Sequence, residues 1–87
     1  MLIFDGQFHG ACDLGCSLWA NEATFGRVRF DISRTILMDV LKGGNPANDG
    51  ANIRLCNNNR SRIETACQRA FENRPNAHVI LETSDFI

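Results

Sequence analysis

The segment FGRVRFDISRTILMDVLKG, residues 25–43, places a strand pattern directly before a helix pattern. In its first part, apolar side chains occupy every second position: Val28, Phe30 and Ile32. This alternation with charged residues predicts a strand over residues 25–32 that has one apolar and one charged face. Ser33 follows where a helix N-cap belongs, because its hydroxyl can accept from the free amides of the first turn. We therefore expect the strand to pass straight into a short helix, which Gly43 ends in the left-handed conformation.

Two further strands are expected on the N-terminal side of this segment. LIF, residues 2–4, is a brief apolar run that suits an edge strand. CSLWA, residues 16–20, suits a second strand and holds the one tryptophan of the chain. NEAT, residues 21–24, would then turn the chain back, so that these residues and the strand at 25–32 form a hairpin.

A longer helix pattern begins near Asn48 or Asp49 and runs to about Glu72, where Pro75 stops it. Apolar or small side chains share one side of this helix: Ile53, Cys56, Ile63, Cys67, Ala70 and Phe71. Residues 57–59 are three consecutive asparagines, which are poor helix formers. We therefore expect the helix either to be kinked at this point or to start late.

HVILET, residues 78–83, is predicted to be the last strand of the chain. The element order is then strand, hairpin, two helices, strand. This order predicts an α+β fold of two layers, in which a small antiparallel sheet packs against two helices. The N-terminal strands, the hairpin and the C-terminal strand would form that sheet. We expect residues 1–87 to be a single domain, because a chain of this length builds one core.

The composition favours neither nucleic acid nor membrane as a partner. The chain has nine basic and ten acidic residues, and its formal net charge is −1. A balanced charge gives no general attraction to polyanions, although a local basic patch still can. No run approaches the roughly 20 apolar residues of a membrane span, and the N-terminus lacks the pattern of a signal peptide. We expect a cytoplasmic protein whose four cysteines remain reduced.

Four segments carry a resemblance to a known family: TFGRVRFDI, ISRTIL, NRSRIETA and HVILETSDF. Their order and spacing, from about Ser17 to Phe86, are similar to those of a bacterial family called domain of unknown function 1488. Residues 5–15 match poorly, and Cys56 stands where the family often has an aromatic residue one turn before the helix arginine. The resemblance implies a bacterial protein with an α+β fold. It implies no reaction, cofactor or catalytic residue, because the family has none assigned.

A zinc site is the first chemical possibility, because His9, Cys12 and Cys16 have the spacing H-x2-C-x3-C. A structural site needs a fourth ligand, for which three candidates remain: Cys56, Cys67 and His78. The first two lie on the apolar side of the predicted helix, where buried free cysteines act as small apolar residues. A pair of C-x2-C knuckles is absent from the sequence. We predict no bound metal, no other cofactor and no native disulfide.

Nucleic-acid binding is the alternative function that the long helix suggests. Four polar residues project away from its apolar side: Arg54, Asn58, Arg62 and Arg69. Arginine and asparagine are the residue types that contact phosphates and base edges. Glu72 shares this face, however, and neither a helix-turn-helix spacing nor a pair of stacking aromatics accompanies it. A solvated polar helix face explains the same residues.

Catalysis has less support, because the sequence has no G-x-S-x-G and no phosphate-binding glycine loop. We therefore expect a small non-catalytic interaction or accessory module that acts through an unknown protein partner or through self-association as a homodimer. Small two-layer domains leave a sheet edge or face that a second copy can cover. Trp19, Phe8 and Phe25 are the apolar residues expected nearest to such a surface, unless all three lie in the core.

Arg60 is the unusual residue of the long helix, because it falls within the apolar side. A buried unpaired guanidinium is very costly, so Arg60 must reach water or meet an acceptor. Glu64 is one turn later, but this order of charges is the weaker arrangement. We predict a structural ion pair between Arg60 and Asp85, which would tie the end of the last strand to the helix. The functional alternative is that Arg60 is open to an anionic ligand.

Overall fold

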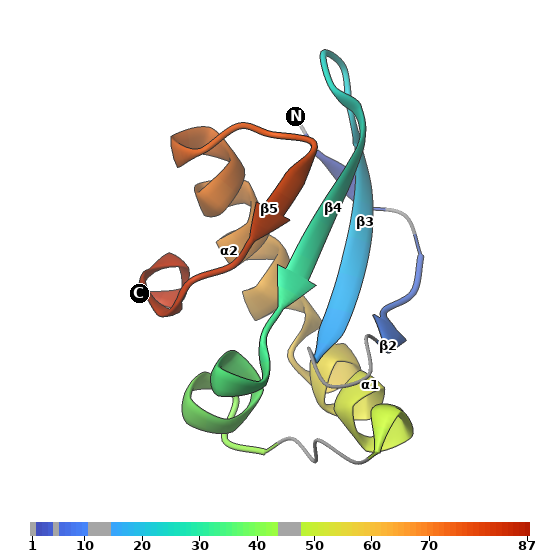
Figure 1. Cartoon of the computed structure of the whole chain (residues 1–87), viewed down its shortest axis with the longest axis vertical. Coiled ribbons are helices and arrows are strands. Elements are labelled where there is room, and N and C mark those ends of the chain that lie inside the picture. The colour runs from blue at the N-terminus through green and yellow to red at the C-terminus, as the bar shows by residue number, and fades with distance from the viewer. Residues whose placement is uncertain (1, 5, 11–14, 44–47) are drawn as a thin grey trace.

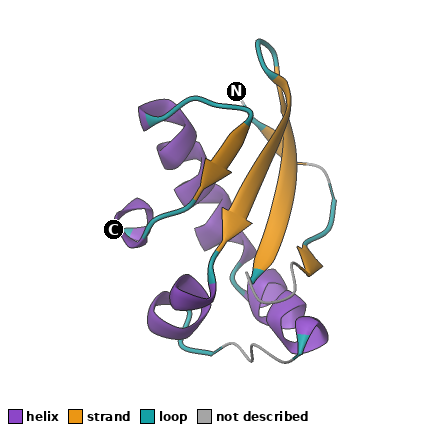
Figure 2. Ribbon diagram, viewed as in Figure 1, coloured by secondary structure: helices purple, strands orange, loops and turns teal. Residues whose placement is uncertain are grey.

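The computed structural model describes residues 2–4, 6–10, 15–43 and 48–87. Within them, one mixed sheet contains five strands: β1 (Ile3–Phe4), β2 (His9–Gly10), β3 (Cys16–Glu22), β4 (Gly26–Ile32) and β5 (His78–Ile80). Two α-helices and two short helical turns accompany it: α1 (Asp49–Asn58), α2 (Arg60–Asn73), η2 (Ile36–Val40) and η3 (Thr83–Phe86). Figures 1 and 2 show the sheet in front of α2, with α1 beside the end at which β3 begins. The fold is α+β, as the sequence predicted.

The β3–β4 hairpin forms the centre of the sheet. β1 and β2 both pair antiparallel with β3, near its end and its beginning respectively. The hairpin strands extend to Glu22 and from Gly26, so their turn is slightly later than the expected residues 21–24. The Glu22 carboxylate accepts from the amides of Thr24 and Phe25 at 2.7 and 2.8 Å. Glu22, the last residue of β3, thus stabilises the turn that follows it.

The direction of the last strand differs from the expected antiparallel sheet. β5 pairs parallel with β4, with Arg29 opposite His78 and Asp31 opposite Ile80. The segment between the two strands is a crossover connection, in which α2 returns the chain toward the beginning of β4, and parallel pairing is the usual result of such a connection. β5 is also shorter than predicted, because the chain turns into η3 at Thr83.

The strand-to-helix junction is confirmed at Ser33, whose hydroxyl accepts from the Ile36 amide at 3.3 Å. The helical turn that follows is wider than an α-helix, because the Leu41 amide donates to the Ile36 carbonyl at 3.0 Å. The left-handed residue at its end is Lys42, with φ of 59°, and not Gly43 as expected. The Gly43 amide instead closes the end by donating to the Leu37 carbonyl.

The predicted long helix is divided at Asn59 into α1 and α2, where the run of asparagines indicated a kink. Asn48 caps α1, since its side chain accepts from the Ala51 amide at 3.0 Å. Asn59 donates from its side chain to the Leu55 carbonyl at 2.8 Å. An asparagine therefore begins the first helix and another ends it, which is the local hydrogen bonding that makes this residue a poor interior helix former.

The core lies between the apolar face of the hairpin and α2. Ten of its described side chains are fully buried: Cys16, Leu18, Ala20, Val28, Phe30, Ile32, Cys56, Ile63, Cys67 and Ala70. The alternation predicted for residues 25–32 is therefore confirmed in β4. Phe8 also lies in this core, with 3% exposure, so it is not available to an interaction surface.

Candidate interaction surface

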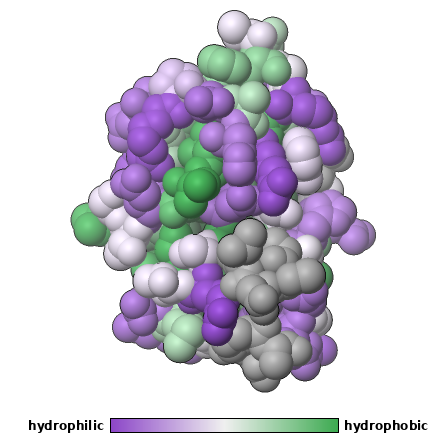
Figure 3. All heavy atoms as spheres, viewed as in Figure 1, coloured by the Kyte–Doolittle hydropathy of each residue, from purple (hydrophilic) through white to green (hydrophobic). Residues whose placement is uncertain are grey.

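The sheet has a second face, turned away from α2, which we call the open face. Strand register places its side chains in three rows across the sheet: His9, Ser17, Asp31 and Ile80; Trp19, Arg29 and His78; Ile3, Asn21 and Arg27. The view of Figure 1 looks onto this face. In the same view, Figure 3 shows hydrophobic surface over β5 bordered by hydrophilic side chains. The open face is thus a mixed surface.

The charged groups at its centre satisfy one another. Asp31 accepts from the Arg29 Nε at 2.9 Å through one oxygen, and its other oxygen lies 2.6 Å from His78 Nε2. The Arg27 guanidinium lies over the Trp19 ring, 4.9 Å from its centroid, which is a cation–π contact. These contacts give the polar side chains of the open face partners within the sheet and fix their orientation.

The apolar groups of the open face are more exposed. Ile3 is 67% exposed and Ile80 is 60% exposed, at opposite corners of the face. Trp19 lies between them in the register and is partly buried. Such side chains lose unfavourable water contact when another surface covers them. Phe25, the third predicted aromatic, lies instead at the hairpin turn, where its ring meets that of Phe71 edge to face at 5.5 Å.

The outer edge of β5 is protected against further strand pairing. Its Ile80 carbonyl accepts from Arg74 at 3.3 Å, and its His78 amide donates to the Asn76 side chain at 3.3 Å. Side chains thus occupy backbone groups that another strand would need. Contact with a partner is therefore better suited to the face of the sheet than to this edge.

Asp31 contacts His78 through Nε2, whereas the acid of a hydrolase triad holds its histidine through Nδ1 and leaves Nε2 facing the nucleophile. Among the described residues, no hydroxyl or thiol is hydrogen-bonded to His78. Ser17, which shares a row with Asp31, is only 6% exposed. The pair of His78 and Asp31 thus has no described nucleophile hydrogen-bonded beside it on the open face.

The predicted pair of Arg60 and Asp85 is replaced by two different pairs. Arg60 Nε donates to Glu64 at 2.7 Å, and its guanidinium lies over the Phe8 ring at 5.2 Å. Arg69, which does reach the η3 turn, is nine residues after Arg60. At about 100° per residue this separation turns their side chains to opposite sides of α2, so Arg60 faces away from Asp85.

Arg74, which the helix pattern did not single out, is the partner of Asp85. Its guanidinium binds both carboxylate oxygens, at 3.2 and 2.8 Å, and the Glu82 amide donates to the same carboxylate at 2.8 Å. Burial of Asp85 raises the pKa of its carboxyl, but the hydrogen bonds from Arg74 and Glu82 outweigh this effect and leave the pKa below its ordinary value. The expected tie between the last strand and the long helix is thus made from the helix C-terminus.

The polar helix residues proposed for nucleic acid are divided between two helices. Arg54 and Asn58 are exposed on α1. On α2, Arg62 donates to the Val40 carbonyl at 3.3 Å and lies over the Phe86 ring, and Arg69 donates to the Asp85 carbonyl at 3.5 Å. Two of the predicted cations therefore hold neighbouring segments of the chain together, which weakens the support for one free basic face.

The described cysteines and histidines lie in different environments. Cys16, Cys56 and Cys67 are buried free thiols, and His9 and His78 are exposed in β2 and β5. Cys12 lies outside the described residues. In the described part of the chain, no group of three or more histidine, cysteine or acidic side chains could hold a metal ion.

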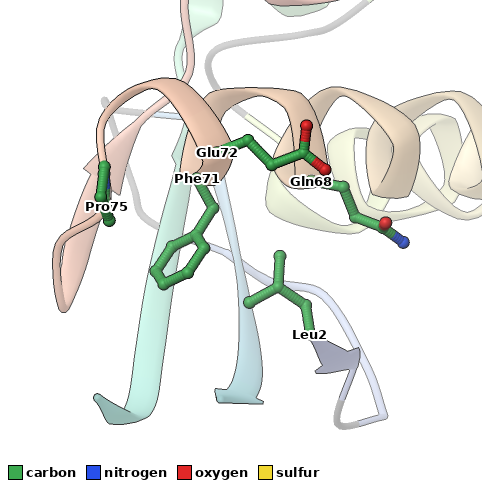
Figure 4. A pocket seen from close by; sticks show the side chains of 5 residues that line it. All are labelled: Leu2, Gln68, Phe71, Glu72 and Pro75. Carbon is green, nitrogen blue, oxygen red and sulfur yellow. The ribbon is translucent and has the colours of Figure 1, made fainter. Parts of the chain in front are cut away.

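One small cavity of about 290 Å³ lies between the N-terminal segment and the last turns of α2. Five residues line it: Leu2, Gln68, Phe71, Glu72 and Pro75. Figure 4 shows Phe71 and Leu2 pointing toward each other below the helix, while the polar ends of Gln68 and Glu72 extend away from them. Small-molecule sites combine an apolar lining with convergent polar groups, and this cavity has only the apolar part.

Comparison with known proteins adds no relative: no protein-family model, curated protein or solved structure matches the chain. Within the described ranges, every helix is too short or too polar to reach across a lipid bilayer.

Proposed function

We propose that this protein is a small non-catalytic interaction module and that the open face of its sheet is the contact surface. The observation that carries the proposal is the pair of exposed isoleucines, Ile3 and Ile80, on either side of Trp19. The face offers apolar area to a partner, while its charged groups are already paired with one another. The partner that we propose is a second copy of the chain, which would make the protein a homodimer.

The size of the sheet sets the strength of this contact. Two strands of seven residues, one of three and two of two form the described sheet. At roughly 3.3 by 4.8 Å for each residue, they cover about 330 Å² in projection. Stable interfaces bury about 800 Å² of each partner. A face-to-face dimer is therefore expected to be weak and to form in a concentration-dependent way.

We further propose that the protein belongs with the bacterial family that its sequence resembles and that it acts in the cytoplasm. Support for the first proposal is that the four resembling segments fall on β4, on the junction to η2, on α2, and on β5 with η3. These segments supply the central strand and the helix that covers it. Support for the second is the set of buried free thiols, which suits a reducing compartment.

Sedimentation velocity over a wide concentration range tests the contact surface. We expect the wild-type chain to shift from monomer toward dimer as its concentration rises. Replacing both isoleucines in an Ile3→Thr/Ile80→Thr variant keeps β-branched side chains in the strands but removes apolar area, so this shift should be lost. Met38→Gln is the matched control, because Met38 is 50% exposed on η2, outside the sheet.

A wild-type chain that stays monomeric at every concentration would remove the homodimer from the proposal. A dimer that persists unchanged in the Ile3→Thr/Ile80→Thr variant would place the contact elsewhere. The nucleic-acid alternative has its own test, which is a salt-dependent gel shift lost when Arg54, Arg62 and Arg69 become alanine.

A further inference from the structure

A cavity of about 190 Å³ lies between α2 and η3, and two arginines of α2, Arg62 and Arg69, line it. They are seven residues apart, which is about two turns, so their side chains leave the helix on the same side. Thr65 lies between them along the helix, and Phe86 of η3 contributes to the other wall. We call this cavity the arginine pocket. It is formed by the helical elements and not by the open face of the sheet.

Neither arginine of this pocket has an acidic partner among the described residues. Arg62 donates to the Val40 carbonyl at 3.3 Å, and Arg69 donates to the Asp85 carbonyl at 3.5 Å. These acceptors are neutral, and no described carboxylate forms an ion pair with either guanidinium. Asp85 also lines the pocket, but its carboxylate is bound by Arg74. Because a guanidinium has five N–H donors, both arginines retain positive charge and donors for a ligand.

Contacts with the protein hold both guanidinia at the pocket. The two carbonyls tie Arg62 to η2 and Arg69 to η3, and Arg62 also lies over the Phe86 ring, 5.9 Å from its centroid. Side chains that are ordered in advance lose less conformational entropy on binding. Phe86 and the buried Ala66 add apolar lining beside these charges. The pocket thus combines apolar lining with convergent polar groups, which is the combination that small-ligand sites use.

We propose that the arginine pocket binds a small anion that carries negative charge at both ends, with one end on Arg62 and the other on Arg69. Two helical turns separate the Cα atoms of these residues by about 10.5 Å along the axis, and parallel side chains keep this spacing. After two charge-assisted hydrogen bonds of about 2.8 Å, about 5 Å remains between the terminal oxygens of the ligand. A diphosphate and a four-carbon dicarboxylate both suit this length, and guanidinium groups bind phosphate and carboxylate alike. The site does not depend on the proposed dimer.

Thr65 allows a sharp test of this geometry. It is exposed, and its hydroxyl donates to the Ser61 carbonyl at 3.0 Å. Thr65→Glu places a carboxylate three residues after Arg62 and four residues before Arg69, and both separations allow ion pairs on a helix. This carboxylate would occupy the two guanidinia in place of the ligand, while glutamate is a better helix former than threonine. Thr65→Gln is the matched control, because glutamine has the same length and no charge.

Isothermal titration calorimetry of the full-length protein in metal-free buffer of constant ionic strength measures the binding. The probes are pyrophosphate and succinate, each compared with its short counterpart, inorganic phosphate or acetate. We expect one site per chain for at least one of the two long anions. Its short counterpart should bind about tenfold more weakly, because it reaches only one guanidinium. A preference for pyrophosphate indicates a diphosphate as the ligand, and a preference for succinate indicates a dicarboxylate.

The variants identify the pocket as the site of binding. Thr65→Glu and the double variant Arg62→Gln/Arg69→Gln should both lose it. Thr65→Gln should bind as wild type does, and so should Arg34→Gln, which removes an exposed arginine outside the pocket. Circular dichroism of each variant separates a loss of binding from a loss of fold.

Several results would overturn the proposal. One is the absence of binding of both long anions at millimolar concentration, and another is that neither binds more tightly than its short counterpart. Binding that persists in Thr65→Glu would place the anion elsewhere. An oligonucleotide that binds through Arg62 and Arg69 when neither long anion binds would assign these arginines to the nucleic-acid alternative instead. The first two results come from the wild-type chain, so they do not depend on the folding of any variant.

Discussion

Removing Arg74 should destabilise the protein more than removing any other arginine. Its guanidinium makes two hydrogen bonds to the Asp85 carboxylate and one to the Ile80 carbonyl. The Asp85 side chain is only 3% exposed, whereas that of Arg74 is 37% exposed. Arg74→Ala therefore leaves a buried carboxylate with the Glu82 amide as its remaining donor.

The expected loss of stability follows from this difference in exposure between Arg74 and Asp85. Breaking a buried ion pair on one side costs about 3–5 kcal/mol. Water can enter where the exposed Arg74 side chain was, so we expect about 2–3 kcal/mol for Arg74→Ala. Asp85→Ala leaves an arginine that water can solvate, and its expected cost is about 2 kcal/mol, mainly from lost hydrogen bonds. The double variant should cost less than the sum, with a coupling energy of about 1–2 kcal/mol.

Urea unfolding followed by circular dichroism measures these free energies. For a chain of this size, the loss in Arg74→Ala corresponds to an unfolding temperature lower by roughly 10–20 °C. Arg54→Ala is the matched control, because Arg54 is exposed on α1 and its loss should change stability by less than about 0.5 kcal/mol. The ion pair between Arg74 and Asp85 would be refuted as a stabilising contact if the losses of unfolding free energy in the two single variants added up to that of the double variant. An Arg74→Ala protein as stable as the Arg54→Ala control would refute it as well.

Three further predictions concern acid, Arg60 and Gly15. Burial raises the pKa of Asp85, but Arg74 and the Glu82 amide lower it further, so the folded pKa is below the ordinary value. The ionised Asp85 therefore stabilises the fold above the ordinary carboxyl pKa, and this contribution is lost as pH falls below about 4. The urea midpoint should fall less between pH 7 and pH 3 in Asp85→Asn than in wild type. Arg60→Ala should cost only about 0.5–1.5 kcal/mol in the same unfolding assay, since its pair with Glu64 is about one-third exposed, and a loss as large as that of Arg74→Ala would contradict this assignment. Gly15→Ala should cost more than about 3 kcal/mol, because φ is +103° and the new Cβ would lie 2.1 Å from the Ile32 carbonyl oxygen; Gly6→Ala, at φ of +74° in open space, should cost about 1–2 kcal/mol.

The features that sequence predicted are those encoded by neighbouring residues. The alternation of apolar and charged residues predicted β4, because successive side chains of a strand point to opposite faces of the sheet. The three asparagines indicated the break at Asn59, because their side chains compete with the helix for local hydrogen bonds. Ser33 was recognised as a cap for the same reason. In these cases the partners are at most four residues apart, so the sequence itself displays the interaction.

The direction of β5, and the position of its side chains on the open face, depend on contacts between residues that are far apart in the sequence. Alternation showed that Arg29 and Asp31 share the charged face of β4, but His78 and Ile80 join them only through the pairing of β5. That pairing depends on where α2 ends relative to β4. A long connection that contains helices allows parallel pairing but does not require it. Each helix that runs along the sheet reverses the chain once, so the direction of the last strand depends on how many of the connecting helices do so, and the order of elements alone leaves it open.

The assignment of a partner to Asp85 shows why helix periodicity alone was insufficient. A helical wheel compares residues within the helix, and it singled out Arg60 because an arginine on an apolar side needs an acceptor. The wheel contains no residue beyond the last turn, so Arg74, at the helix C-terminus and next to Pro75, was never compared. Yet a side chain at the end of a helix is the one best placed to bind the segment that follows it. The chain passes from Arg74 through β5 to Asp85 in eleven residues, and this short return brings the two charges together. The search for a partner of a buried acid should therefore begin at the nearest chain reversal and only then extend to the helix faces.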